Sequence, residues 1–310
     1  MDINWREYPP DWTMPLELPV GISHILSRIG LKEIVNTTLT YAPSATADAF
    51  HVAASAGRTA VVEHLLYSTT LGSISQRSFF LGLEAAMIKG HSEVVKELFN
   101  HSHDYLEQNL IEGATIRALI LSCIMGNVSM ATTALSRFDL CSGHFVHDMV
   151  KSIFDDLTEH SPNGERASKM DAATTFLEDF SIGLWTPFMI ASAFGNYNII
   201  FLLAKCSGPD PTISETQFAL WTALHNEDTQ TMSACFQTAN GILDKSTMMA
   251  MACFSGNTEF ARLLLENGAD VNMDLKGSTP LEIASSQGHE ELIRVLKDNG
   301  ANDPRNSAVC

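Results

Sequence analysis

A glycine recurs at intervals of about thirty residues in this chain, each time within the same apolar pattern. The aligned positions are Gly30, Gly57, Gly90, Gly126, Gly195, Gly256 and Gly288. The successive steps are 27, 33, 36, 69, 61 and 32 residues, so each of the two long steps has room for one further unit. Apolar residues four, five, eight and nine positions after these glycines indicate one face of a helix. A period of this length predicts an array of stacked helical units.

A small residue lies four positions before the glycine in nearly every unit. These residues are Ala53, Ala86, Ser122, Ala191, Ala252 and Ala284. Small side chains let two antiparallel helices approach closely, and a glycine supplies the positive φ of the turn between them. Each unit is therefore expected to be a helix-turn-helix.

Three short motifs lie in phase with this repeat. Thr279-Pro280-Leu281 and Thr186-Pro187-Phe188 read T-P-L and T-P-F, and residues 267–272 read N-G-A-D-V-N. Residues 48–51 hold the position of a T-P-L-H motif with only His51 intact. In these motifs the chain resembles the ankyrin-repeat family. The resemblance implies an all-α solenoid with one concave face, on which ligands of the family commonly bind.

The alignment predicts nine units, two of them irregular. One irregular unit lies between Gly195 and Gly256, with Glu227 near the glycine position. The other lies within residues 137–184, where we expect a helix over 147–160, an overlong loop over 161–169 and a second helix over 170–180. Prolines in residues 1–16 predict an extended N-terminal arm. Residues 17–310 are expected to form one cooperative solenoid, because no unit can bury its apolar face alone.

The charge of the chain limits its partners. There are 36 acidic and 19 basic side chains, for a net charge of −17. Such a surface repels phosphates, which argues against nucleic acid and anionic membranes as partners. No run of about 18 apolar residues predicts a membrane span. Six scattered cysteines without a secretory signal predict reduced thiols in a cytoplasmic protein, with the nucleus as the alternative compartment. A monomer is expected.

Three positions per unit are expected to face the concavity: one before the T-P-L motif and two before the glycine. They are small or polar in the terminal units and apolar in the central ones, where Lys89 is the single charge. The apolar residues are Phe80, Ile88, Ile116, Ile124, Met125, Trp185 and Phe194, and Phe254 extends the set. Because exposed apolar area costs about 25 cal/mol per Å², a contiguous patch predicts a binding groove.

Three other interpretations of these apolar positions remain open. The N-terminal arm could fold back into the groove, or the irregular unit at 137–184 could lean over it. The assignment could also be shifted by one residue in a divergent unit, which would place the side chains inside. In an intermediate case, the arm and the long loop close one side and leave a pocket for an apolar small molecule.

The sequence contains no standard catalytic motif, so enzymatic activity is left undecided. Lys89, beside apolar neighbours, is a candidate base or hydrogen-bond donor, although its stem could instead carry the ammonium into water. His225 and Asn226 hold equivalent positions in the degenerate unit and are polar candidates on the same face. His144 and His147 with Asp148 have a spacing compatible with metal ligation, but a solvated helix start explains them as well. No metal or cofactor is predicted.

Two hypotheses follow for function. The first is a non-catalytic module that binds a protein partner through its concave face, the partner presenting an apolar segment with basic residues. The second is a scaffold that binds a lipophilic small molecule, such as a terpenoid or polyketide, and catalyses its cyclisation or isomerisation. Pocket shape with one or two polar groups would suffice for the second, since holding a reactive conformer can itself accelerate a reaction.

Overall fold

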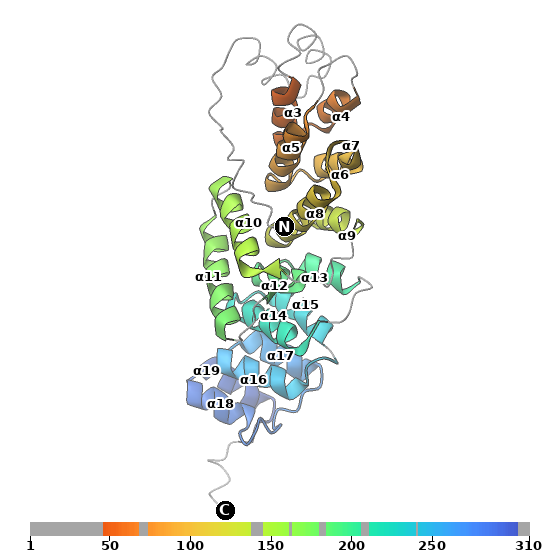
Figure 1. Ribbon diagram of the computed structural model, residues 1–310. Helices are drawn as coiled ribbons and strands as arrows, with labels where there is room; N and C mark the ends of the chain where they lie inside the picture. Colours follow the sequence, from red (N-terminus) through yellow and green to blue (C-terminus); the bar gives the residue numbers. More distant parts are fainter. Residues whose placement is uncertain are drawn as a thin grey trace, which may run out of the picture. The chain divides into compact units, whose positions relative to one another are not determined.

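A computed structural model describes residues 46–67, 74–137, 145–160, 163–179, 184–205, 211–239 and 241–302. Seventeen helices and one two-stranded sheet lie in these residues (Figure 1). The all-α prediction is therefore confirmed. The predicted arm at 1–16 and the first unit around Gly30 lie outside the described residues. The chain divides into two compact units, residues 1–111 and 112–310.

The described part of the first unit contains two stacked helix pairs. These are α3 (Thr46–Ser55) with α4 (Thr59–Tyr67), and α5 (Gln76–Ile88) with α6 (Ser92–Asn100), followed by the short α7 (Ser102–Tyr105). Helix α3 packs on α5, and α4 packs on α6. The ring of Phe79 stacks between those of Phe50 and Tyr105, at centroid distances of 6.0 and 4.6 Å. Each apolar face is thus buried by the neighbouring repeat.

The second unit is built of helix pairs of the same kind. Helix α8 (Gln108–Met125), which begins in the first unit, pairs with α9 (Val128–Leu135). The following pairs are α12 (Pro187–Ala193) with α13 (Tyr197–Ala204), α14 (Ile213–His225) with α15 (Thr229–Ala239), α16 (Lys245–Ser255) with α17 (Thr258–Glu266), and α18 (Pro280–Gln287) with α19 (Glu290–Asp298). Helices α12, α14, α16 and α18 pack in succession, as do α9, α13, α15, α17 and α19. We call α8 and the first series the inner helices and the second series the outer helices.

The repeat glycines take the backbone conformation that the alignment predicts. In the described residues φ lies between 70° at Gly57 and 77° at Gly195 and Gly288. Glu227 holds the same position in the degenerate repeat with φ of 52°. Its N–H donates to the carbonyl of Leu224 at 3.2 Å, as that of Gly57 donates to Ala54 at 3.1 Å. Residues 220–228 therefore form a true repeat turn without its glycine.

Glu227→Gly is expected to raise the free energy of unfolding by about 1 kcal/mol. A left-handed residue other than glycine costs about 1–2 kcal/mol, and part of this gain is lost because glycine is more flexible in the unfolded chain. Urea unfolding followed by circular dichroism measures the difference. Glu259→Gly, in helix α17, is the control and should instead destabilise by about 1 kcal/mol. If the Glu227→Gly variant were no more stable than the wild type, the backbone at Glu227 would not be strained.

A side-chain clasp joins several repeats to the one before. The side-chain amide of Asn196, the residue after Gly195, donates to the carbonyls of Cys123 at 2.6 Å and Ile124 at 3.1 Å. A Cβ atom on Gly126 would lie 2.5 Å from the Oδ1 atom of Asn196. His91 makes the equivalent hydrogen bond to the carbonyl of Ser55 at 2.9 Å. The α12–α13 repeat therefore stacks directly on the α8–α9 repeat.

The residues between these two repeats form an insert outside the stack. The insert begins with strand β1 (Phe145–Val146), which pairs antiparallel with β2 (Leu184–Trp185) and closes the base. Between the strands lie α10 (His147–His160) and α11 (Gly164–Asp179), which we call the hairpin. Helix α11 packs against the inner helices α12 and α14 (Figure 1).

The structure corrects the interpretation of residues 137–184. The first helix has the predicted bounds, but residues 161–169 are not an overlong loop, because α11 begins at Gly164. The side chain of Asn163 accepts hydrogen bonds from the N–H groups of Glu165 and Arg166 and so starts the helix early. The pair is also not one of the stacked units, since α9 contacts α13 directly.

Candidate functional site

An aromatic contact seats the hairpin on the inner helices. Phe154 of α10 and Phe194, at the end of α12, have ring centroids 5.8 Å apart. Each side chain is only 6% exposed. Val150, Ile153 and Leu157 of the same helix are also buried. The apolar face of α10 is therefore buried against the stack, as an amphipathic helix requires.

Trp185 supplies a second contact at the base of the hairpin. Its ring is stacked on that of His147, with centroids 6.3 Å apart, and meets Phe218 of α14 edge-on at 5.6 Å. Its Nε1–H donates to the Nδ1 atom of His147 at 3.1 Å. An indole N–H can only donate, so Nδ1 of His147 carries no hydrogen in this arrangement. Trp185 is 0% exposed. Its indole N–H is therefore buried, and the Nδ1 atom of His147 is the acceptor that satisfies it.

An ion pair provides the third contact. The guanidinium of Arg117 in α8 donates to Asp156 of α10 at 2.8 Å. The Arg117 side chain is 7% exposed, whereas that of Asp156 is 43% exposed. Lys169 of α11 also lies over the turn at Gly195, where a Cβ atom would be 3.6 Å from its ammonium nitrogen. The hairpin thus spans the inner side of α8, α12 and α14.

The prediction that an open groove lies here is wrong for three of the residues expected to line it. Trp185 is 0%, Ile124 2% and Phe194 6% exposed. The reason is physical: α10 covers Trp185 and Phe194 with its own aromatic and apolar side chains. The alternative in which residues 137–184 lean over the inner helices therefore describes this part of the chain.

The other candidate residues are more accessible. Lys89, His225 and Phe254 are exposed, the last at 52%, and Phe80, Ile88, Ile116, Met125 and Asn226 are partly exposed. Asn226 donates to the carbonyl of Ala193 at 2.8 Å, so it serves as a clasp between repeats. Phe80, Ile88 and Lys89 belong to the first unit and the rest to the second. Ligand binding by any of them stays a prediction.

Exposure of the inner helices changes beyond the hairpin. The two residues before the repeat glycine are Ala193 and Phe194 in α12 and its cap, where they are 0% and 6% exposed. The corresponding residues at the end of α16, Phe254 and Ser255, are exposed. Ser286 and Gln287 of α18 are exposed too. The inner face is therefore covered over α12 and open over α16 and α18.

Sequence analysis missed the residues that hold the hairpin. Phe154, Asp156 and Arg117 were not candidates, and His147 was considered only for a metal. The spacing of apolar residues in α10 could have indicated this contact, because a helix with one apolar face packs that face against another surface. In the part of the chain that the structure describes, no group of three His, Cys, Asp or Glu side chains is placed to hold a metal ion.

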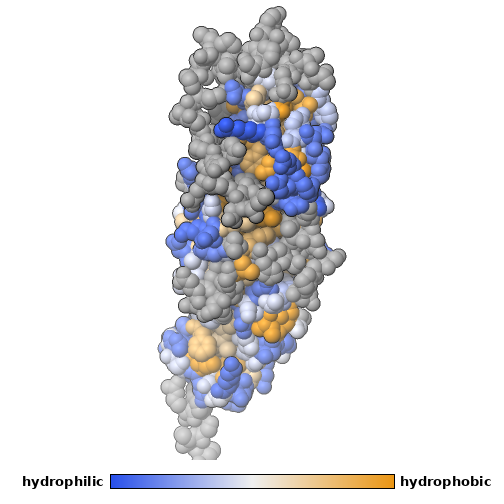
Figure 2. Space-filling model, viewed as in Figure 1, coloured by the Kyte–Doolittle hydropathy of each residue, from blue (hydrophilic) through white to orange (hydrophobic). Residues whose placement is uncertain are grey.

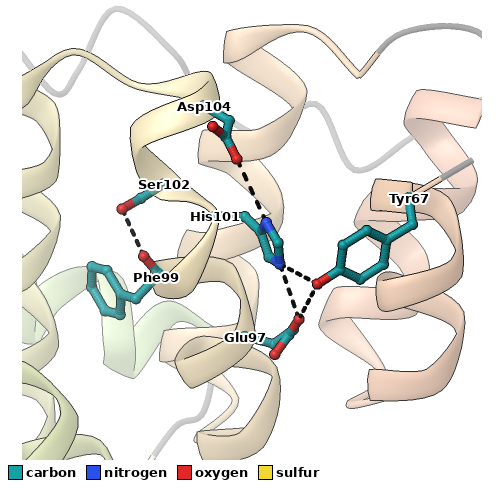
Figure 3. Close-up of polar contacts among 6 residues, drawn as sticks. All are labelled: Tyr67, Glu97, Phe99, His101, Ser102 and Asp104. Carbon is teal, nitrogen blue, oxygen red and sulfur yellow. Dashed lines mark hydrogen bonds and ion pairs between the residues drawn. The ribbon is translucent and has the colours of Figure 1, made fainter. Parts of the chain in front are cut away.

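A polar cluster joins helices α4, α6 and α7 of the first unit (Figure 3). The Nε2 atom of His101 lies 2.7 Å from the hydroxyl of Tyr67 and 3.2 Å from Glu97, and its Nδ1 atom lies 3.6 Å from Asp104. Burial and then the charge of Glu97 raise the pKa of Tyr67 above its usual range. A phenol with a raised pKa is a poor nucleophile. The cluster therefore serves to connect α4 with α6.

The described cysteines are expected to resist alkylation while the chain is folded. Burial raises the pKa of Cys235 and of Cys253 to about 12, and raises that of Cys123 further. Because the thiolate is the reactive form, iodoacetamide should modify these three only after denaturation. Mass spectrometry of native and urea-treated samples checks this. Labelling of Cys123 in the native protein at the rate of a free thiol would contradict the burial.

A shallow pocket of about 200 Å³ lies between the outer helices α15 and α17. Met232, Phe260 and Leu263 line it together with the charged Glu259, Arg262 and Glu266. Sites for drug-sized ligands usually measure about 300–1,000 Å³. This pocket is therefore too small to hold a lipophilic substrate of the kind considered above.

Comparison with known proteins supports the repeat assignment. Residues 220–306 match the model of the family described as ankyrin repeats (3 copies). Together with the stacked helix pairs and their positive-φ turns, this match supports an ankyrin-repeat solenoid as the fold of the chain. No curated protein matches the chain. None of the helices in the described ranges has both the length and the apolarity to cross a membrane.

Proposed function

We propose that this chain is a module that binds a protein partner on the open inner face of α16 and α18. The observation that carries the proposal is the exposure of Phe254, at 52%, immediately beyond the part of the inner face that the hairpin covers. Ankyrin repeats generally mediate protein–protein interaction. An exposed aromatic side chain on a rigid helix is the usual anchor of such an interface.

The charge around this face indicates what the partner carries. Residues 211–302 contain twelve acidic and five basic side chains. Lys245 donates to the carbonyl of Asn267 at 2.7 Å, and Arg262 lies 3.7 Å from Glu259, so both cations are already engaged. Figure 2 shows hydrophobic residues among hydrophilic ones over the C-terminal helices. A partner with an apolar anchor and basic flanks fits such a surface.

The second hypothesis, an enzyme acting on a lipophilic substrate, gains no support. Its groove depended on Trp185, Ile124 and Phe194, which are buried. No observation in the described residues favours a particular reaction. We therefore advance the protein-binding function alone.

Affinity capture with the full chain tests the proposal. Bound proteins would be quantified by mass spectrometry for the wild type, for Phe254→Ser and for Tyr67→Ser. Tyr67 is a matched control, because it is also an exposed aromatic residue, at 64%, but lies on α4. We expect at least one partner to fall by about tenfold with Phe254→Ser and to persist with Tyr67→Ser. An identical set of partners for all three chains would overturn the proposal.

A further inference from the structure

We propose that the hairpin is a detachable occupant of a second docking surface, and that the surface beneath it binds an acidic amphipathic helix of a partner protein. This inference does not depend on the partner proposed for α16 and α18. It concerns the inner side of α8, α12 and α14, where α10 and α11 now lie.

The first support is that the stack is complete without the hairpin. Asn196 reaches the carbonyls of Cys123 and Ile124 in α8, and Gly126 leaves just enough room for its side chain. Outer helix α9 packs on α13 as the other outer helices pack on one another. Release of the hairpin would therefore leave the neighbouring repeats joined.

The second support is the composition of the surface beneath the hairpin. Phe194 and Trp185 occupy positions that are polar in the terminal repeat, where Gln287 is exposed and Ser278 is partly exposed. Ile116 and Met125 of α8 are partly exposed. A solvent-exposed inner face would carry polar residues at these positions, so the apolar residues found here are suited to an apolar occupant.

The third support is the specificity of the three contacts. The occupant supplies an aromatic ring for Phe194, a carboxylate for Arg117 and an acceptor for the indole N–H of Trp185. In the hairpin, the ring and the carboxylate are two residues apart, at Phe154 and Asp156. A nearly buried guanidinium favours an anionic group and disfavours a cationic one. The matching partner is therefore a helix with an aromatic residue close to acidic ones.

Hydrogen exchange of the wild-type chain is the first test. Because the hairpin is expected to open while the stack stays folded, amides of α10 and α11 should exchange about tenfold or more faster than those of α12 and α14. Mass spectrometry of peptic fragments reports both. Exchange of all four helices at one common rate would show that the hairpin opens only when the unit unfolds, which would overturn the proposal.

Peptide binding is the second test. The probe is a fluorescein-labelled synthetic peptide with the sequence of residues 147–160, added to full chains and followed by anisotropy. In the chain Phe154→Asp, the internal hairpin is weakened and the peptide should bind with a roughly micromolar Kd. The wild type and the control Asp155→Asn, whose altered side chain faces solvent, should bind about tenfold more weakly because their own hairpin competes.

Two further samples define the chemistry of the site. A peptide with Phe154→Ser and Asp156→Lys should not bind, and the chain Phe154→Asp with Arg117→Leu should lose the parent peptide. No saturable binding by a Phe154→Asp chain that keeps its helical circular dichroism would overturn the proposal. Dimers of that chain, seen by light scattering at the assay concentration, would also overturn it, because the occupant would then be a second copy. If the Phe154→Asp chain does not fold, the hydrogen-exchange rates of the wild-type chain decide whether the proposal holds.

Discussion

Gly126→Ala is expected to lower the free energy of unfolding by about 3 kcal/mol. Gly126 has φ of 74°, and a left-handed alanine costs about 1–2 kcal/mol. The new methyl group would also lie 2.5 Å from the Oδ1 atom of Asn196 and displace its side chain. Loss of the two hydrogen bonds to Cys123 and Ile124 adds about 1–3 kcal/mol. Urea unfolding measures the sum.

Two glycine controls separate these contributions. Gly241 has φ of 97° with open space around it, so Gly241→Ala reports the backbone cost alone, about 1 kcal/mol. Gly164 has neither a positive φ nor a neighbour within 4 Å, and Gly164→Ala should be nearly neutral. A loss at Gly126 no larger than at Gly241 would mean that Asn196 does not join these two repeats.

Phe154→Ala is expected to lower the free energy of unfolding of the second unit by about 3 kcal/mol. The side chain is 6% exposed and lies on Phe194, and removal of a buried phenylalanine costs about 3–5 kcal/mol. We choose the lower end because a hairpin at the surface can close part of the cavity. Thermal and urea unfolding measure the effect, and a dye that binds apolar surface should report the uncovered groove.

Ile213→Ala is the control for this substitution. Ile213 is a large apolar residue that is 58% exposed, so its truncation should cost less than about 1 kcal/mol. If Phe154→Ala were as mild as Ile213→Ala, the aromatic ring would not lie buried between the hairpin and α12.

Much of the fold could be predicted because each repeat carries its own local signals. The glycine spacing located the turns, including the one in which Glu227 takes the place of the glycine with φ of 52°. The T-P-L motif located the start of α18, where Thr279 and Glu282 form a reciprocal cap. These signals act within a few residues, so a single sequence reveals them.

The place of the hairpin could not be predicted in the same way. The spacing of Val150, Phe154 and Leu157 predicts a helix with one apolar face, but it does not say which surface that face meets. In repeat proteins each unit normally contacts only its neighbours in the chain. The hairpin breaks this rule, since Asn196 reaches past it to α8.

The candidate site was therefore only partly predictable. The sequence singled out Trp185 and Phe194 as apolar, but the prediction that they are exposed was wrong because α10 lies on them. Arg117 and Asp156 are 39 residues apart in the sequence. Nothing in the local sequence pairs two charges at that separation.

A double-mutant cycle on Arg117 and Asp156 tests most directly whether the hairpin lies on the inner helices. The single variants Arg117→Met and Asp156→Asn and their combination would be compared in urea unfolding. Because the two charges are 2.8 Å apart and Asp156 is 43% exposed, we predict a coupling energy of about 1 kcal/mol. Effects that add to within about 0.4 kcal/mol would mean that the two side chains do not interact, and would contradict the placement of α10 over α8.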